Sequence, residues 1–295
     1  TMTVTANQIR KTAARLGEKI IHTPTLEAPM LSRHLGCDLL LKMECLQHTS
    51  SFKARGALNA MLNLSDKQRK NGVITMSAGN HAQAVAYHAE RMGIPATIVM
   101  PAQTPFAKVA RTRAFGANVV LEGRNLNECE GTVNQLIDDQ ALTLIHPYDN
   151  ELVMMGQGTA GLEILTDAPA IDILVVPIGG GGLIGGIATI ARDMRPNIKI
   201  YGVQTELYPT MKLAVAGKTI TCGGETLAEG IAVKKPGDVT LPVVQSLVDD
   251  ILLVTERELE WSVGALIEQQ RIVAEGAGAA GIAAILSNPP LFSGK

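Results

Sequence analysis

The sequence lacks the features of three classes of protein. Its 26 basic and 28 acidic residues give a net charge of −2, so it offers no broad basic surface for nucleic acid or an anionic membrane. No apolar run approaches the length of a membrane span, and the N-terminus shows no signal-peptide pattern. The four cysteines have no metal-type spacing, which indicates reduced thiols. We therefore expect a cytoplasmic protein that binds neither nucleic acid nor a membrane.

What the sequence contains is typical of an enzyme with well-buried cores. The 295 residues are 46% apolar and 18% charged, enough for one large domain or two modest ones. Short β-branched runs alternate with helical stretches, and near the N-terminus Thr5-Ala6-Asn7-Gln8 predicts a helix capping box. This alternation predicts an α/β fold with mostly parallel, twisted sheets flanked by helices. The predicted strands are Gly72–Met76, Ala96–Met100, Asn118–Leu121, Ile171–Val176, Ile198–Val203 and Ile251–Val254, and a helix is predicted at Ala82–Met92.

The strongest signal for anion binding is a run of four glycines after a buried strand and before a helix. Glycines let successive N–H groups converge on one anion, and the start of the helix adds partial positive charge. The alternative is a tight turn that only lets helix and sheet pack closely, but four consecutive glycines exceed what a turn needs. We expect phosphate to bind at Gly179, Gly180, Gly181, Gly182 and Leu183.

Two further segments carry candidate functional residues. Lys53 follows Phe52 among small residues at a predicted helix start, and burial there would lower the pKa of its amine and make it a usable nucleophile or base. The alternative is a surface lysine beside Arg55. In Ser77-Ala78-Gly79-Asn80-His81, at the end of a strand, the N–H groups could bind a carboxylate with Asn80 as a side-chain donor. His81 is a candidate base, although a structural role fits its place at a helix start better.

Taken together, these segments resemble the fold-type II pyridoxal phosphate enzymes, specifically the threonine and serine dehydratase group. The resemblance extends over nearly the whole chain, and its motifs occur in the family's order. They are Ser51-Phe52-Lys53-Ala54-Arg55-Gly56-Ala57, Ser77-Ala78-Gly79-Asn80-His81-Ala82-Gln83, Gly156-Gln157-Gly158-Thr159, Gly179 to Leu183, and Glu229-Gly230-Ile231-Ala232-Val233.

The resemblance implies a cofactor, pyridoxal 5'-phosphate, and a role for each matched residue. Lys53 would hold the cofactor through a Schiff base and move the Cα proton, and the glycine run would hold the phosphate. Asn80 would hydrogen-bond the ring hydroxyl, with Phe52 and Glu275 near the ring; alternatively, Glu275 is a carboxylate favoured by a helix N-terminus. The substrate carboxylate would bind the backbone at Ser77, Ala78, Gly79 and His81.

The resemblance also implies the domain organisation and the activity. The fold would be like that of the tryptophan synthase β subunit, with a large cofactor-binding domain from 1–71 plus 150–295. A small mobile domain, 72–149, would close over the substrate, a small amino acid. The expected product of threonine or serine is a 2-oxo acid with ammonia, and the expected assembly is a homodimer.

Three positions depart from the family pattern. Members carry a Ser/Cys-Gly-Gly-Asn segment near the C-terminus that contacts the ring nitrogen, and this sequence, which ends at Lys295, has no equivalent. Serine racemases of this fold have a serine where Ala78 stands, and an alanine cannot exchange a proton, which favours elimination over racemisation. Racemase-like members bind a metal through a glutamate and an aspartate six positions later, whereas here Lys212 follows Glu206, so we expect no metal.

Other interpretations of the sequence stay open. A β-replacement enzyme such as cysteine synthase is disfavoured by the residues after Lys53. Hydroxyaspartate and arylserine dehydratases are not separated from threonine dehydratase. A non-catalytic protein that binds a phosphorylated small molecule would keep the glycine run but would not need Lys53.

Overall fold

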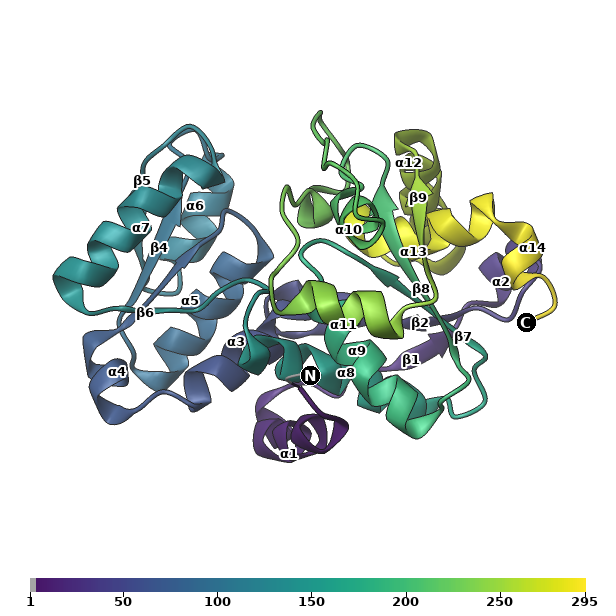
Figure 1. Cartoon of the computed structure of the whole chain (residues 1–295), viewed down its shortest axis with the longest axis horizontal. Helices are drawn as coiled ribbons and strands as arrows, with labels where there is room; N and C mark the ends of the chain where they lie inside the picture. The colour runs from purple at the N-terminus through teal and green to yellow at the C-terminus, as the bar shows by residue number, and fades with distance from the viewer. Residues whose placement is uncertain (1–3) are drawn as a thin grey trace.

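The computed structural model describes residues 4–295 and contains two parallel sheets and one small antiparallel pair. In Figure 1 the two sheets lie toward opposite ends of the long axis, with helices of the middle of the chain between them. The helices are α1 Ala6–Leu16, α2 Pro29–Leu35, α3 Lys53–Leu62, α4 Asp66–Asn71, α5 Asn80–Met92, α6 Phe106–Arg113, α7 Leu126–Gln140, α8 Glu151–Asp167, α9 Gly182–Met194, α10 Thr210–Val215, α11 Thr240–Leu247, α12 Glu256–Ala265, α13 Gly276–Ser287 and α14 Pro289–Phe292.

The first parallel sheet has four strands in the order β5-β4-β3-β6. Successive residues of a strand point to opposite faces, so each strand serves two cores. Val73 and Ile98 pack with α5 on one face, whereas Ile74 and Val99 pack against Val133 of α7 on the other. The strands are β3 Val73–Met76, β4 Ala96–Met100, β5 Asn118–Leu121 and β6 Thr143–Leu144.

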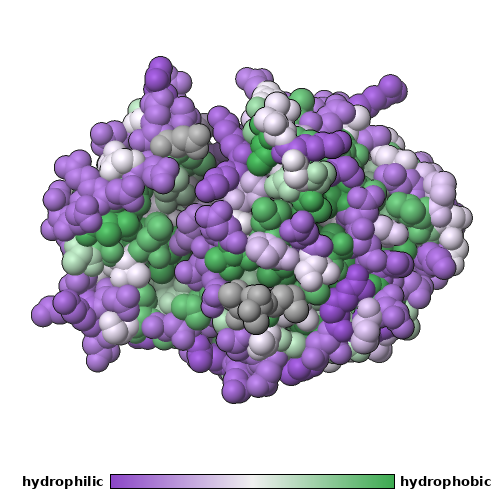
Figure 2. All heavy atoms as spheres, viewed as in Figure 1, coloured by the Kyte–Doolittle hydropathy of each residue, from purple (hydrophilic) through white to green (hydrophobic). Residues whose placement is uncertain are grey.

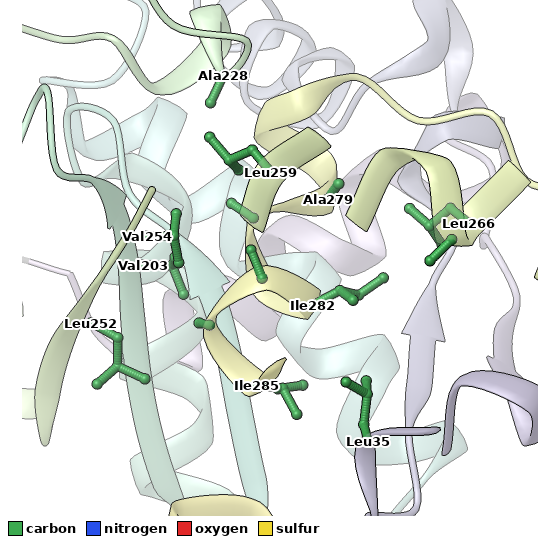
Figure 3. Close-up of a cluster of buried hydrophobic side chains, with 14 of the residues drawn as sticks. Leu35, Val203, Ala228, Leu252, Val254, Leu259, Leu266, Ala279, Ile282 and Ile285 are labelled. Carbon is green, nitrogen blue, oxygen red and sulfur yellow. The ribbon is translucent and has the colours of Figure 1, made fainter. Parts of the chain in front are cut away.

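The second parallel sheet has three strands in the order β7-β8-β9 and is also covered on both faces. Ile200 packs with residues of α9, whereas Val203 faces the opposite way into the core around α13. Figure 3 shows Val203 and Val254 of this sheet facing Ile282 and Ile285 of α13. The strands are β7 Ile173–Pro177, β8 Lys199–Thr205 and β9 Asp250–Val254, and the antiparallel pair is β1 Thr25–Glu27 with β2 Leu40–Lys42.

Helix α8 runs through the centre and is buried on most sides, because glycines let its neighbours approach closely. A Cβ added at Gly156 would lie 2.5 Å from the Cα of Gly56 in α3, and one added at Gly158 would lie 2.9 Å from the carbonyl of Gly186 in α9. Helices α3 and α9 are thus in backbone contact with the same helix. Since α3 begins at Lys53 and α9 begins at Gly182, α8 fixes the distance between the two predicted site elements.

The predicted α/β class with parallel sheets flanked by helices is confirmed, and the strands at 96–100 and 118–121 have the predicted bounds. The capping box at Thr5 is present, with Gln8 as its partner. The predicted strand at 171–176 begins two residues later, and β7 ends at Pro177, which an edge strand tolerates. All four strands of the first sheet fall between 73 and 144, but the division into a large domain and a mobile 72–149 domain stays a prediction.

Hydrophilic side chains cover much of the face shown in Figure 2, and hydrophobic residues show between them in scattered groups. Within residues 4–295, no helix is long and apolar enough to cross a membrane.

Candidate active site

Lys53 is the first residue of α3, where Phe52 is the N-cap. Its ammonium group donates a hydrogen bond to the carbonyl oxygen of Pro147 at 2.6 Å, and it lies 5.4 Å from the centre of the Phe52 ring. Removal from water lowers the pKa of Lys53 to about 8, and the nearby Glu275 carboxylate partly opposes that shift. The amine is therefore available as a nucleophile or base near neutral pH, and the alternative of an ordinary surface lysine does not describe it.

Asn80 and Glu275 meet in the same place although 195 positions separate them. The side-chain amide of Asn80, at the start of α5, donates to Oε1 of Glu275 at 2.8 Å, and Glu275 is the N-cap of α13. Burial raises the pKa of Glu275, while the hydrogen bond from Asn80 and the charge of Lys53 act in the opposite direction. The structure thus places Asn80 in contact with Glu275, and Lys53 close enough to Glu275 for their charges to interact, while the roles of the three residues stay a prediction.

The four-glycine run forms the turn between β7 and α9, with Gly181 at a φ of 97°. Within the described residues, no protein acceptor bonds the N–H groups of Gly179, Gly180, Gly181, Gly182 and Leu183. Gly180 to Gly182 are nevertheless buried. Five successive donors without a protein partner at a helix start are suited to an anion, because buried N–H groups otherwise find an acceptor. This observation fits a phosphate group.

The same glycines also leave no space for side chains. A Cβ on Gly180 would overlap the ring of Tyr148, and one on Gly181 would lie 2.8 Å from the hydroxyl of Thr240. The hydroxyl of Thr240 donates to the carbonyl of Gly180, which fixes the turn. Close packing and anion binding are therefore both properties of this loop, and neither excludes the other.

In the segment Ser77–His81, some backbone N–H groups are hydrogen-bonded within the protein and others are not. The N–H of Ser77 continues the sheet by donating to Val99 at 3.2 Å, and the N–H of Gly79 donates to the Ser77 hydroxyl. In the part of the chain that the structure describes, the N–H groups of Ala78, Asn80 and His81 have no protein acceptor. These three amides, at the start of α5, are free to bind a carboxylate.

The His81 ring lies in the core, only 2% exposed, and its Nε2 is 2.8 Å from the carbonyl oxygen of Ile145. Burial, together with the charge of Lys53, lowers the pKa of His81 to about 3, so the ring is neutral and Nε2 carries the hydrogen. This arrangement agrees with a structural side chain rather than a catalytic base.

Sequence reasoning missed the segment from His146 to Asp149, which connects the glycine loop to Lys53. Pro147 accepts the hydrogen bond of Lys53, and the Tyr148 ring covers Gly180 while its hydroxyl donates to the carbonyl of Lys235 at 3.0 Å. Asp149 accepts from the N–H of Val239 at 2.7 Å. Burial raises the pKa of Tyr148 to about 12. The sequence marks this segment only by a Pro-Tyr pair after a short strand, and such a pair does not by itself indicate a functional site.

Residues Glu206 and Lys212 bear on the predicted absence of a metal. The Lys212 ammonium bonds the carbonyl of Ile251 and lies 3.3 Å from the Asp250 carboxylate. No group of three or more His, Cys, Asp or Glu side chains able to hold a metal occurs among the described residues. That no metal binds beside Glu206 stays a prediction.

The chain belongs to the pyridoxal-phosphate dependent enzyme family, whose model matches residues 16–295. It is 45% identical over 280 residues to an L-threonine ammonia-lyase of Thermotoga maritima, covering 94% of this chain and 70% of that protein. It is 44% identical over 287 residues to a catabolic L-threonine dehydratase of Staphylococcus aureus, covering 96% of this chain and 83% of that one.

Solved structures give the same result for the fold. The T.th. threonine deaminase superposes with a TM-score of 0.93 at 36% identity, covering 98% of this chain and 94% of that one. Maize serine racemase superposes with a TM-score of 0.93 at 35% identity, covering 97% of this chain and 87% of that one. The predicted resemblance to fold-type II pyridoxal phosphate enzymes is therefore confirmed, and so is the predicted cofactor. The buried amine of Lys53 and the five free amides fit that cofactor's aldehyde and phosphate.

Proposed function

We propose that this chain is a pyridoxal phosphate-dependent ammonia-lyase that removes water and then ammonia from a small β-hydroxy amino acid, L-threonine or L-serine. The product is a 2-oxo acid. The observation that carries the proposal is a buried Lys53 amine close enough to Glu275 for their charges to interact, with Glu275 hydrogen-bonded to Asn80. The acceptor of Lys53, Pro147, directly precedes Tyr148, which packs on the glycine loop. Its similarity to L-threonine ammonia-lyase over most of the chain supports the choice of reaction.

The residues that would hold the cofactor are those that the sequence singled out. Lys53 would hold the aldehyde carbon, and the amides from Gly179 to Leu183, which have no protein acceptor among the described residues, would hold the phosphate. The side-chain amide of Asn80 would be the donor for the ring hydroxyl, and Phe52 and Glu275 would lie near the ring. When bound, pyridoxal phosphate withdraws electrons from the Cα atom of the attached amino acid and so acidifies its hydrogen.

The chain's own groups then bind the substrate and move its protons. The free amides of Ala78, Asn80 and His81 bind the carboxylate and orient the Cα–H bond. Lys53 accepts the Cα proton at Nζ, since a pKa of about 8 leaves a fraction of the amine neutral at pH 7. In its protonated form, Lys53 is also the donor for the leaving β-hydroxyl.

Ala78 supports elimination rather than racemisation. Its methyl group lies within the same Ser77–His81 segment and has no proton to exchange. Proton transfer at Cα is therefore left to Lys53 alone, on one face of the substrate. The variant Ala78→Ser tests this point, because it offers a hydroxyl where the wild type has none.

The predicted closure of 72–149 over the substrate also belongs to this proposal. Two contacts support it by joining the first sheet's segment to the rest of the chain: the Asn80–Glu275 hydrogen bond and an ion pair at 2.6 Å between Lys108 and Glu229. We further propose a cytoplasmic homodimer, on the family resemblance. Light scattering of the purified protein gives the mass that tests the dimer.

The first experiment is an absorbance spectrum of the purified protein, followed by addition of L-threonine and an assay for 2-oxobutanoate, with Lys53→Ala alongside. A yellow wild type that makes the oxo acid, beside an inactive variant without the lysine-linked band, supports the cofactor, the role of Lys53 and the reaction. A yellow protein inert toward threonine and serine moves the substrate to hydroxyaspartate or an arylserine. A protein that stays colourless after reconstitution with the cofactor contradicts the enzyme assignment and leaves a non-catalytic phosphate-binding protein.

A further inference from the structure

Arg55 is completely buried two residues after Lys53. Its Nε and Nη2 donate to both oxygens of Glu44, at 2.9 and 2.7 Å. Its Nη1 and Nη2 donate to both oxygens of Glu163 in α8, at 2.7 and 2.8 Å. Nη1 also donates to the hydroxyl of Thr159 at 3.1 Å. Two bidentate carboxylates therefore hold one planar guanidinium in a single orientation.

The carboxylates are themselves fixed by other groups. Glu44 accepts from the Thr23 hydroxyl at 2.6 Å, and Glu163 accepts from the Lys42 ammonium at 2.6 Å. Lys42 in turn donates to the carbonyl of Thr23 at 2.6 Å, which closes the network. Burying such charges costs several kcal/mol for each ion, and replacing a buried ion network with apolar side chains is often neutral for stability. Stability alone is a weak reason for this network.

The backbone of the same helical turn is held by further side chains. Nε2 of His88 lies 2.9 Å from the carbonyl oxygen of Ala54, and the amide oxygen of Gln157 accepts from the N–H of Gly56 at 3.1 Å. Residues 54, 55 and 56 are thus each held by a side chain from another segment, the first by α5 and the other two by α8. Lys53 itself makes a single side-chain hydrogen bond, to Pro147, through a flexible four-carbon stem.

We propose that Arg55 is a positioning residue for Lys53: the Arg55–Glu44–Glu163 network fixes the first turn of α3 and thereby the place from which the Lys53 amine reaches the reacting carbon. This inference rests on the proposed function, in which Lys53 holds the cofactor. A displacement of about 1 Å at a reacting group can cost about 100-fold in rate, so the position of this turn matters more than its contribution to folding.

The test compares two holoenzyme variants, Arg55→Lys and Arg192→Lys. Arg192 is a matched control because its guanidinium also makes several bonds, to Leu247, Ile198 and Asp249, near the far end of α9 from the glycine loop. A lysine keeps the charge at either position but cannot make two bidentate contacts. Both variants are measured for thermal stability, for kcat and KM, and for the pH midpoint of the visible band that Lys53→Ala abolishes.

We expect Arg55→Lys to lower kcat by about 10- to 100-fold with little change in KM, and to move the pH midpoint of the visible band by about half a unit or more. Arg192→Lys should lower thermal stability yet leave kcat and the midpoint unchanged. The inference is overturned if Arg55→Lys changes neither quantity, or if the two variants lose activity only in proportion to their stability.

A second variant covers the case in which Arg55→Lys does not fold. Glu44→Gln keeps the volume of the side chain and removes one charge. It therefore weakens the interaction with Arg55 without leaving a cavity. A shifted midpoint in folded Glu44→Gln supports positioning, and an unchanged midpoint with unchanged kcat contradicts it. If the wild type shows no visible band that depends on Lys53, the proposed function itself fails, which the spectrum distinguishes from failure of the Arg55 inference.

Discussion

The ionisation of Lys53 decides when its amine can react. Because burial lowers its pKa to about 8, the neutral fraction of this amine rises as the pH passes upward through 8. Ordinary lysines reach the same point only at about pH 10.4. We expect an amine-specific reagent to modify Lys53 of the cofactor-free protein well before surface lysines at pH 8 to 9, as measured by peptide mass spectrometry. Modification only above pH 10 would contradict the lowered pKa.

Two buried histidines should make the protein sensitive to mild acid. Burial lowers the pKa of His81 to about 3 and that of His88 to about 4, below the 6.5 of an unfolded histidine. Below pH 6.5 the unfolded chain therefore binds up to two more protons than the folded protein. As the pH decreases from 6.5, the free energy of unfolding falls by roughly 1.4 kcal/mol per pH unit for each histidine. Urea unfolding between pH 7 and 5 measures this slope. In His81→Gln, unfolding should take up about one proton fewer, so the slope of the free energy of unfolding against pH should be correspondingly smaller.

Ser50 holds an unfavourable backbone conformation just before the lysine segment. Its φ is 59°, and Thr49 beside it has a φ of 57°, a region that costs a non-glycine residue about 1 kcal/mol or more. We expect Ser50→Gly to raise the free energy of unfolding by about 0.5 kcal/mol, since relief of strain outweighs the added freedom of the unfolded chain. Ser50→Ala keeps the strain and should show no gain. Chemical denaturation of the three proteins decides between these outcomes.

The sequence offered candidate side chains for the site, whose roles stay predictions, but not all of the groups that contact them. Lys53, Asn80 and Glu275 could be predicted because each lies in a motif or at a helix start. The carbonyl of Pro147 could not, because a backbone acceptor leaves no mark in the sequence. The ring of Tyr148 over Gly180 was equally hidden, since it depends on how two distant segments pack.

The loop of four glycines has no space for a side chain at Gly180 or Gly181. Gly180→Ala would force its methyl group into the Tyr148 ring, which packs over the free amides. We expect this variant to lose about 1–3 kcal/mol of stability and at least about tenfold in affinity for pyridoxal phosphate. Gly131→Ala in α7 is the control, because nothing lies within 4 Å of its added methyl group. Titration of the cofactor into both proteins measures the difference, and equal affinities would refute the role of the loop.

Long, strongly patterned elements could be predicted from sequence, and short ones could not. The strand Ala96–Met100 is mostly β-branched and apolar and has a proline on either side, so its bounds were predicted correctly. Strand β6 has two residues and β1 has three, too few for any periodicity to appear. Helix α5 begins at Asn80, two residues before the predicted start, because Gly79 is its N-cap.

At the scale of the whole molecule, the ion pair between Lys108 and Glu229 joins the segment of the four-stranded sheet to the rest of the chain. Glu229 is largely exposed and Lys108 is partly exposed, so the pair contributes at most about 1 kcal/mol. We expect Lys108→Met to change the stability by less than that amount. If the proposed closure over the substrate uses this contact, the variant should also raise KM for threonine by up to about 5-fold. Steady-state kinetics at low salt measures the change in KM. An unchanged KM would show that the pair takes no part in closure.

The parallel nature of both sheets followed from the alternation of strands and helices, but the order of the strands did not. β3 lies between β4 and β6, and β8 lies between β7 and β9, which the sequence pattern leaves undetermined. The meeting of Asn80 with Glu275 across 195 positions is likewise a property of the assembled chain.

The hydrogen bond between Lys53 and Pro147 also orients the amine. A carbonyl oxygen only accepts, so a neutral amine resting there must use one of its two hydrogens for this contact. Its lone pair of electrons then points away from Pro147, because the lone pair and the hydrogens occupy different corners of one tetrahedron. The Pro147 carbonyl therefore restricts the lone pair of the neutral amine to two of the four corners of that tetrahedron, both of which face away from residue 147.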